Sequence, residues 1–532
     1  MNIIAVIPAR AGSKGIPNKN VRLLNGHPLI YYAINNALKS KLITQIIVST
    51  DSPVVKQIAT QMGVEVHWRP IALCGDDITL DAVIYDATKD IPSDYIITMQ
   101  PTSPTLKTTT LDAAIEYCIA NNYDTVMSVI NSPHLAWIKN SMGEIIPAYK
   151  ERLNRQYLPP YFLETGAFFI SRTSIVKENS RFGQLVNIYP ISESEAIDID
   201  SFADLRQAEH ILSNKSIAIY VNGNNLCGTG HIYRALEPAD EFYSKPTIYY
   251  DLNQTKRSVF GNTTHTLIPI NGLNGLLSTL KNEQYNIFIN DILSTTTEYM
   301  NMLRIVLPNA KIINFEDDGP GAALADIVIN SLYNESDEKN AFTGERYYIA
   351  PKQFLFAQTN VIHPHVKTIF ISFGGADPNN YTDRYLEIVS QKQYINYNFI
   401  AVLGRAKKNI DFLMGYNKYP NISVYFDVAN MPELINKCDI AITSCGRTGY
   451  ELALLGVPSI AMAQNERETR HRFISKENGF NYLGLNPSDK DLIEALDTYI
   501  NLSYIERKQI QNTMLSHNLT QGRRNILTLL NT

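Results

Sequence analysis

The chain has 532 residues, of which 45% are hydrophobic and 19% are charged, and its formal net charge at pH 7 is −5. This length is too great for one hydrophobic core, so we expect two to four globular domains. The slightly acidic balance excludes a bulk attraction to nucleic acid, and any basic binding site must therefore be local.

The apolar residues before position 212 alternate between short runs and helical periodicity. Buried strands are predicted at 2–9, 45–50, 95–100, 125–130, 167–171 and 187–191, and helices at 28–40, 52–62 and 201–212, with Ser201 as the last helix's N-cap. Strands joined by crossover helices indicate a mostly parallel sheet that binds ligands at the carboxyl ends of its strands.

A polar joint at 213–215 precedes a second series of strands. Strands are predicted at 216–224, 285–291, 310–318 and 325–330, a loop near 350–365, and a further β-first unit from 367 onward. We therefore expect an α/β protein with a first domain at 1–214. Two lobes at 215–355 and 356–532 would follow, with a cleft between them.

The compartment is predicted from the cysteines and from the absence of a long apolar run. The odd number of cysteines and their spacing favour thiols of a reducing compartment over a metal site; they are Cys74, Cys118, Cys227, Cys438 and Cys445. No signal peptide and no apolar run of transmembrane length occur, so we expect a cytoplasmic protein without a membrane partner. No basic patch interleaved with aromatic residues predicts a nucleic-acid partner.

The stretch "IPARAGSKGIPNKN" at 7–20 follows the first predicted strand. Gly12 and Gly15 allow the backbone to approach a ligand closely, while Arg10, Lys14 and Lys19 supply three cations. Amides and cations in such a loop can cradle phosphates. A solvated basic turn would explain the glycines and one lysine equally well, and the spacing of a Walker A loop is absent.

This stretch is the first of six short motifs that follow one another along the first 200 residues. They are "IPARAGSKGIPNKN", "IIVSTDS" at 46–52, "RPIALCGDD" at 69–77, "MQPTSP" at 99–104, "RQYLPPYFLETGA" at 155–167 and "DID" at 198–200. Over about residues 1–212 the chain resembles the acylneuraminate cytidylyltransferases, which join CMP to nine-carbon sialic-acid-like sugars. The resemblance implies a Rossmann-like αβα nucleotidyltransferase domain that uses CTP and releases pyrophosphate.

The resemblance also assigns roles on the nucleotide side. It implies that Arg10, Lys14 and Lys19 contact the phosphates, with Lys19 catalytic at the α-phosphate. The residues that help to hold cytidine would be Asn20, Arg69 and Asp76.

The "DID" block predicts the metal site. Two residues apart on a strand end, Asp198 and Asp200 would face the same side, where paired carboxylates suit Mg²⁺. The alternative is an acidic cap on the helix at 201.

On the acceptor side, the resemblance assigns the sugar acid to Gln100, Arg155 and Gln156. An arginine suits a carboxylate because it binds it through two hydrogen bonds. Many sialic acid enzymes read Asn-Gly-Ala where this chain has Thr165-Gly166-Ala167, which favours a legionaminic or pseudaminic type of nonulosonic acid. Relatives pair through the region near 131–181, so a homodimer is expected.

A second glycine-rich loop occurs in "NNLCGTGHIYRAL" at 224–236. A histidine there can act as a general acid or base, although a lone histidine is usually structural. The spacing of Gly228, Gly230, His231 and Arg234 resembles the UDP-sugar hydrolases of pseudaminic acid synthesis, which share the two-lobed GT-B architecture. The resemblance implies a catalytic His231 and a UDP-linked deoxy-diamino hexose as substrate.

Later blocks extend this second resemblance over about 216–532. They are "FIND" ending at the candidate catalytic Asp291, "FEDDGPGAALADIVIN" at 315–330, "SFGGADPNN" at 372–380 and "TSCGRTGYELALLGVPSIAMAQNERE" at 443–468. Backbone amides at Gly374, Gly375 and Thr448 are predicted to bind a diphosphate.

Two further substrate contacts are expected on these blocks. Glu451 matches a residue that accepts a ribose hydroxyl, and an ordinary helix-surface glutamate is the alternative. Asn465 also aligns with a substrate residue, although Asn465-Glu466 replaces the usual Asn-Gln, and Ile292-Leu293 follow Asp291 where the hydrolases have histidine and an aromatic residue. The alternatives for this half are a binding module without catalysis and a glycosyltransferase.

Overall fold

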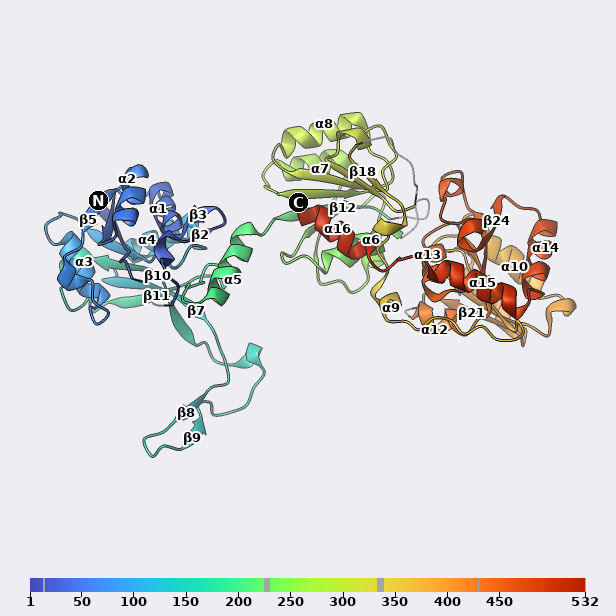
Figure 1. Cartoon of the computed structure of the whole chain (residues 1–532), viewed down its shortest axis with the longest axis horizontal. Helices are drawn as coiled ribbons and strands as arrows, with labels where there is room; N and C mark the ends of the chain where they lie inside the picture. Colours follow the sequence, from blue (N-terminus) through green and yellow to red (C-terminus); the bar gives the residue numbers. More distant parts are fainter. Residues whose placement is uncertain (13–14, 224–229, 333–338, 429, 532) are drawn as a thin grey trace. The chain divides into compact units, whose positions relative to one another are not determined.

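The computed structural model describes residues 1–12, 15–223, 230–332, 339–428 and 430–531. These residues form two compact units, Met1–Asn214 and Lys215–Thr532, and each unit has its own sheets and cores (Figure 1). None of the helices in the described part of the chain has the length and apolar character that crossing a membrane requires.

The first unit contains the strands and helices of one αβα layer structure. Its strands are β1 (Ile3–Pro8), β2 (Leu23–Leu24), β3 (His27–Pro28), β4 (Gln45–Thr50), β5 (Glu65–Trp68), β6 (Tyr95–Met99), β7 (Thr125–Asn131), β8 (Trp137–Lys139), β9 (Ile145–Pro147), β10 (Phe162–Arg172) and β11 (Val186–Pro190). Its helices are α1 (Leu29–Lys39), α2 (Pro53–Gln61), α3 (Leu80–Thr88), α4 (Thr108–Ala120) and α5 (Phe202–Ser213). The predicted α/β class is confirmed.

Seven of these strands form one sheet in the order β11-β7-β10-β6-β1-β4-β5. Neighbours pair in parallel except β10, which runs antiparallel to both β6 and β7. The prediction of a mostly parallel sheet is therefore confirmed, and β10 is the exception because it reverses the chain in the middle of the sheet.

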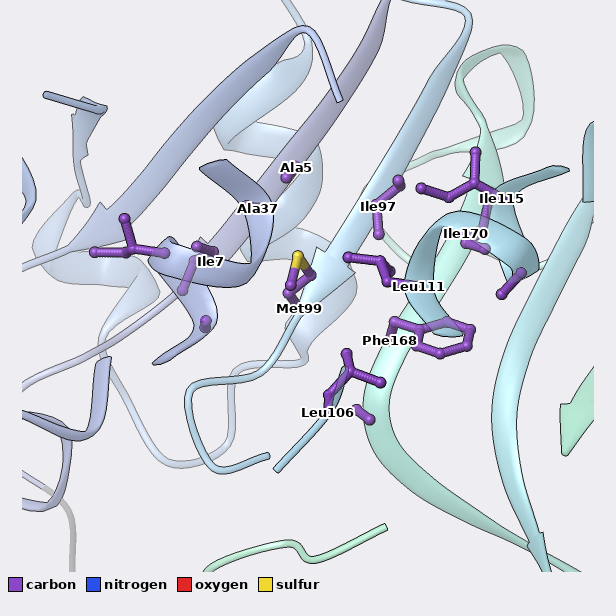
Figure 2. Close-up of a cluster of buried hydrophobic side chains, with 14 of the residues drawn as sticks. Ala5, Ile7, Ala37, Ile97, Met99, Leu106, Leu111, Ile115, Phe168 and Ile170 are labelled. Carbon is purple, nitrogen blue, oxygen red and sulfur yellow. The ribbon is translucent and has the colours of Figure 1, made fainter. Parts of the chain in front are cut away.

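Every second side chain of the central strands β1, β6 and β10 packs into the hydrophobic core of the first unit. Figure 2 shows them meeting residues of α1 and α4; the labelled residues are Ala5, Ile7, Ala37, Ile97, Met99, Leu106, Leu111, Ile115, Phe168 and Ile170. Because side chains two apart on a strand share one face, β1, β6 and β10 each contribute such a pair. This packing fixes the carboxyl ends of β1 and β6, where the loops of the site begin.

The segment that holds Asp198 and Asp200 is irregular, so the expectation that these residues lie on a strand end is wrong. The amides of Asp200 and Ser201 donate to the Asp204 carboxylate, and Ser201 and Asp204 form the capping box that begins α5. Ile199 between the two aspartates is fully buried while both aspartates are exposed, so the pair still shares one side of the segment.

A hairpin of β8 and β9 projects away from the sheet of the first unit (Figure 1). All residues of both strands are exposed, including Trp137, Ile138 and Ile145. The ring of Trp137 packs edge-on against that of Tyr149, with 6.2 Å between centroids, yet these apolar side chains remain exposed, which indicates a surface that another molecule can cover.

The second unit contains two parallel sheets. The strands of the first are β12 (Ile217–Val221), β13 (Thr247–Asp251), β14 (Thr266–Ile270), β15 (Ile287–Asp291), β16 (Lys311–Phe315), β17 (Ile327–Asn330) and β18 (Ala341–Thr343), and those of the second are β19 (Thr368–Ser372), β20 (Asn398–Leu403), β21 (Ile422–Phe426), β22 (Ile440–Ser444), β23 (Ser459–Ala463) and β24 (Phe480–Leu485). The helices are α6 (Gly230–Ala239), α7 (Gly272–Leu280), α8 (Thr297–Val306), α9 (Lys352–Leu355), α10 (Tyr381–Val389), α11 (Ile410–Met414), α12 (Met431–Ile435), α13 (Thr448–Leu455), α14 (Asp489–Ile500), α15 (Tyr504–Leu515) and α16 (Gly522–Asn531).

The strand orders are β14-β13-β12-β15-β16-β17-β18 and β21-β20-β19-β22-β23-β24. The chain passes between the two sheets twice, because α16 returns to the first one, where Ile526 and Leu530 share a core with Ile217 and Ile219. The predicted glycine-rich loop of the second sheet follows the end of β19, whereas Gly228 of the loop predicted for the first sheet lies outside the described residues.

Candidate functional site

A cavity of about 430 Å³ opens at the carboxyl ends of β1 and β6 in the first unit. It is lined by Pro8, Arg10, Gly15, Lys19, Asn20, Leu80, Gln100, Pro101, Thr102 and Asp200. Five of these residues were predicted for the site from the sequence: Arg10, Lys19, Asn20, Gln100 and Asp200. The basic loop and the "DID" segment, almost two hundred positions apart, therefore face the same space.

Lys19 joins these two segments directly. Its Nζ donates to the backbone oxygen of Ile199 at 2.8 Å and to Oδ1 of Asp200 at 3.0 Å. A Cβ on Gly15 would lie 2.6 Å from the backbone oxygen of Asp200, so only glycine allows this approach. The Lys19 side chain is 16% exposed, which leaves its ammonium within reach of a ligand in the cavity.

Arg10 and Asn20 shape the other side of the basic loop. The guanidinium of Arg10 donates to Oδ1 of Asp76 at 2.6 Å and to the backbone oxygen of Cys74 at 3.2 Å. Asn20 donates to the backbone oxygen of Arg10 at 3.0 Å. Asp76 thus acts on the cavity through Arg10, since it orients that guanidinium.

Asp198 is exposed and, unlike Asp200, is not among the residues that line the cavity. Burial raises the pKa of its carboxyl group, the negative charge of Asp200 raises it further, and a hydrogen bond with Thr102 opposes both effects. Two neighbouring carboxylates that repel each other are stabilised by a cation between them.

Gln100, which lines the cavity, lies against Gly166. Gly166 has a φ of +70°, and a Cβ there would lie 2.9 Å from Nε2 of Gln100. Thr165 is not among the residues that line the cavity. Its hydroxyl is buried and donates to Oγ of Ser128 at 2.8 Å, so the side chain belongs to the core.

The remaining residues predicted for the first site lie outside the cavity lining. Arg69 is 4% exposed and donates to the backbone oxygen of Ser49 at 2.8 Å, so it supports the wall. Arg155 and Gln156 are exposed on the turn after the projecting hairpin, where Arg155 pairs with Glu193 at 3.3 Å. Lys14 lies outside the described residues.

In the second unit, His231 and Asp291 are brought together by α6 and β15. Nδ1 of His231 lies 2.6 Å from Oδ1 of Asp291, and both residues are buried. Arg234, one turn along α6, donates its Nε to Oδ2 of Asp291 at 2.6 Å. Although burial raises the pKa of Asp291, Arg234 and His231 lower it overall, so the carboxylate stays ionised beside the imidazole.

Glu316 extends this cluster to the second sheet. Its carboxylate pairs with Arg234, and it accepts a hydrogen bond from Nη2 of Arg447 at 2.7 Å. Burial raises the pKa of Glu316, but the two arginines hold it well below its usual range. The residue adopts a φ of +50°, a conformation that costs energy outside glycine and is found at functional sites.

The residues predicted to bind the diphosphate, and Asn465, predicted as a further substrate contact, follow three neighbouring strands of the second sheet. Gly374, with a φ of +73°, and Gly375 follow β19, Thr448 begins α13 after β22, and Asn465 follows β23. A Cβ on Gly374 would lie 3.8 Å from Oγ of Ser444, so the first two loops are adjacent.

The side chain of Asn465 is hydrogen-bonded within its own turn, whereas that of Glu451 is partly buried. The side chain of Asn465 accepts from the amide of Glu468 at 3.0 Å and so caps its own turn. Burial raises the pKa of Glu451 to about 7 and Arg447 opposes this, which argues against an ordinary surface glutamate.

The sequence prediction missed Thr102, Glu316 and Arg447. Thr102 stands in "MQPTSP", and its polar side chain after a strand end was the available signal. Glu316 and Arg447 are 131 positions apart, and no local pattern pairs them.

No group of three or more His, Cys, Asp or Glu side chains suited to a metal occurs among the described residues. The two carboxylates predicted as metal ligands, Asp198 and Asp200, would leave the other positions on an ion to substrate and water. That sparse carboxylate set fits Mg²⁺, which keeps waters and binds substrate phosphates.

Comparison with known proteins concerns mainly the first unit. Residues 4–217 match the Cytidylyltransferase family. The chain is 33% identical over 217 residues to the N-acylneuraminate cytidylyltransferase of Streptococcus agalactiae serotype V, covering 38% of this chain and 52% of the relative. It is 32% identical over 228 residues to the CMP-N,N'-diacetyllegionaminic acid synthase of Legionella pneumophila, covering 40% of this chain and 97% of the relative.

The chain spans about half the length of the first of these relatives and nearly all of the second. Among solved structures, MurG of Acinetobacter baumannii aligns with a TM-score of 0.43 and 11% identity, over 59% of this chain and 99% of that one.

Proposed function

Because the chain belongs, through residues 4–217, to the cytidylyltransferase family, we propose that its first unit transfers CMP from CTP to a nonulosonic acid and releases pyrophosphate. The observation that carries this proposal is the single cavity shared by Arg10, Lys19, Asn20, Gln100 and Asp200. The reaction joins the anomeric oxygen of the sugar acid to the α-phosphorus of CTP and breaks the bond to the β-phosphate.

The cations of the basic loop would offset the charge of the triphosphate. Lys19 is held against the "DID" segment at a fixed place, so its ammonium needs little reorganisation as charge develops on the α-phosphate. Arg10, oriented by Asp76, would bind a phosphate oxygen from the other side of the cavity. Asn20 fixes the backbone of Arg10 and thereby the shape of the loop.

Asp198 and Asp200 would hold Mg²⁺. When bound, the ion neutralises phosphate charge and orients the triphosphate for in-line attack. Asp200 also pairs with Lys19, so this residue sets the distance between the carboxylate pair and the ammonium.

Gln100 would contact the sugar acid beside Gly166. The Legionella relative is named for N,N'-diacetyllegionaminic acid, and we propose a nonulosonic acid of the legionaminic or pseudaminic type as the acceptor. Arg155 lies off the cavity lining of its own chain. In a homodimer formed through the projecting hairpin, the guanidinium of Arg155 would contact the sugar acid in the cavity of the partner subunit. Light scattering of the purified chain tests whether it is a dimer.

Pyrophosphate release from CTP, Mg²⁺ and a panel of nonulosonic acids tests the main proposal. We expect release with at least one acceptor and none without an acceptor. Absence of release from every acceptor, with CTP binding retained, would contradict the proposed transfer.

For the second unit we propose hydrolysis of a UDP-linked deoxy-diamino hexose. The supporting observation is the buried His231–Asp291 hydrogen bond at 2.6 Å. With its Nδ1 proton donated to Asp291, the imidazole presents Nε2 to a water, which attacks the sugar while the bond to the diphosphate breaks and UDP leaves. Gly374, Gly375 and Thr448 would bind the diphosphate, and Glu451 a ribose hydroxyl.

His231→Asn separates this proposal from its alternatives. Hydrolysis predicts that the variant binds UDP but releases none from the UDP-sugar. A binding module predicts no UDP release from the wild-type chain either. A glycosyltransferase predicts a sugar joined to an acceptor, which mass spectrometry would detect.

A further inference from the structure

Three arginines of the second sheet meet a short acidic segment of the first. Nη2 of Arg447 donates to Oε1 of Glu316 at 2.7 Å, and Arg467 donates to the backbone oxygen of Glu316. Arg470 pairs with Asp318, and Nε of Arg467 lies 3.7 Å from the same carboxylate. The three guanidinium groups therefore converge on one small region of negative charge.

The position of these arginines is the one from which parallel sheets bind phosphates. Arg447 is the N-cap residue of α13 and follows β22, while Arg467 and Arg470 belong to the turn after the neighbouring strand β23. Amides at a helix start and planar guanidinium groups both favour phosphate oxygens. A surface ion pair with the acidic segment would need only one arginine, whereas three follow these two strand ends.

The acidic segment is held in place independently of the arginines. Asp317, between the two paired residues, is buried and accepts from the amide and hydroxyl of Thr295 at 2.9 and 2.6 Å. A Cβ on Gly319 would lie 2.4 Å from the backbone oxygen of Thr295, so the turn packs tightly there. The carboxylates of Glu316 and Asp318 pair with the arginines, and each also accepts a hydrogen bond from a serine hydroxyl, Ser331 at 3.3 Å and Ser294 at 2.9 Å respectively.

A buried imidazole beside the cluster adds a second, independent observation. His471 is 3% exposed and shares its Nδ1 with the backbone oxygen of Cys445 at 2.9 Å, whereas its Nε2 is buried without a partner. Burial lowers the pKa of this histidine to about 4, so it is neutral, and Glu316 and Arg447 are among the charges near it. A bare Nε2 can accept a hydrogen bond from a ligand hydroxyl or amide.

We propose that Arg447, Arg467 and Arg470 add their guanidinium groups to the backbone amides proposed above for the diphosphate of a nucleotide sugar, and that Glu316 and Asp318 occupy this site as an internal counter-anion. The inference rests on the nucleotide-sugar function proposed for this unit. Asp318, whose side chain is 27% exposed, is the carboxylate that the ligand displaces, because Glu316 remains paired with buried Arg234.

Calorimetric titration of the full chain with UDP and with uridine tests this proposal. A Lys19→Ala background weakens phosphate binding by the first unit. Asp318→Asn removes the competing charge, so UDP should bind several-fold tighter while uridine affinity is unchanged. Arg470→Gln should weaken UDP about tenfold, the loss of one charged hydrogen bond, again without an effect on uridine. Arg472→Gln, on the exposed Arg472 two residues along, is the matched control and should change neither affinity.

Opposite effects of the Asp318 and Arg470 variants on UDP support displacement. Effects of the same sign would mean that the arginines only hold the two sheets together, and equal shifts for uridine and UDP would also overturn the proposal. If neither UDP nor uridine binds, the nucleotide-sugar function fails by itself. In that case the chain is titrated with inorganic pyrophosphate. Pyrophosphate binding that is lost in Arg470→Gln supports the arginine site, and absence of pyrophosphate binding overturns the proposal.

Discussion

Replacing Lys19 with methionine should slow cytidylyl transfer and leave the fold of the first unit intact. The ammonium lies 3.0 Å from Oδ1 of Asp200, and we take this as its separation from a phosphate oxygen. At an effective dielectric constant of about 20, two unit charges at that distance attract by about 5 kcal/mol. About half a unit of charge developing in the transition state would then give ~2.5 kcal/mol, or roughly a hundredfold in kcat.

The loss of stability should be much smaller than the loss of rate. The Asp200 side chain is 77% exposed, so the broken ion pair contributes under about 1 kcal/mol. Pyrophosphate release gives kcat, and thermal unfolding followed by circular dichroism gives Tm. Arg22→Met is the matched control, since Arg22 is an exposed cation three residues away that contacts the ring of Phe202 and does not line the cavity.

A kcat for Lys19→Met within about threefold of the wild type, measured at saturating CTP, would refute this reasoning. So would an equal loss in Arg22→Met, because the effect would then reflect net charge near the pocket. A large fall in Tm would instead mean that Lys19 mainly ties the basic loop to the backbone of Ile199.

Asp200→Asn should raise the Mg²⁺ concentration for half-maximal transfer by about tenfold or more, as one of two carboxylate ligands loses its charge; a metal titration measures this. Gly166→Ala should raise KM for the sugar acid by about tenfold and leave KM for CTP unchanged, because the new Cβ displaces Gln100; steady-state kinetics with each substrate varied would detect it. Glu316→Gln should destabilise the second unit by about 3–5 kcal/mol in urea unfolding, since buried arginine charge loses its partner. Uridine affinity should fall as pH drops from 8 to 6, because Glu451, with a pKa of about 7, becomes protonated and stops accepting a ribose hydroxyl; in Glu451→Gln the uridine affinity should be constant across this range.

The strands were predictable because a buried parallel strand consists of consecutive apolar residues. The run at 45–50 matches β4 to the residue, and the capping box at Ser201 begins α5 as expected. The reversal at β10 was not predictable, since a continuous apolar strand reads the same in either direction. Direction depends on how the chain returns to the sheet, which no window of residues contains.

The first site was predictable to the extent that its residues sit directly after strands. Arg10 and Gln100 follow β1 and β6, so the topology alone brings them to one edge of the sheet. The orientation of the Thr165 side chain was not predictable, because its position in a motif says nothing about which face of β10 it occupies. The shift in pairing between Glu164 and Phe169 disrupts the regular register of the strand at that point.

The cluster in the second unit shows why charge arrangements resist prediction more than folds do. His231 and Arg234 share a helix face because they are three residues apart, so their proximity could be anticipated. Glu316 joins them only because Asp317 anchors a turn in which Glu316 adopts a positive φ, and Arg447 reaches it from another sheet. Each of those steps depends on packing between distant segments. The free energy of a buried charge depends on all of these packing contacts together. Displacing one carboxylate would therefore change both the affinity for a diphosphate and the stability of the unit.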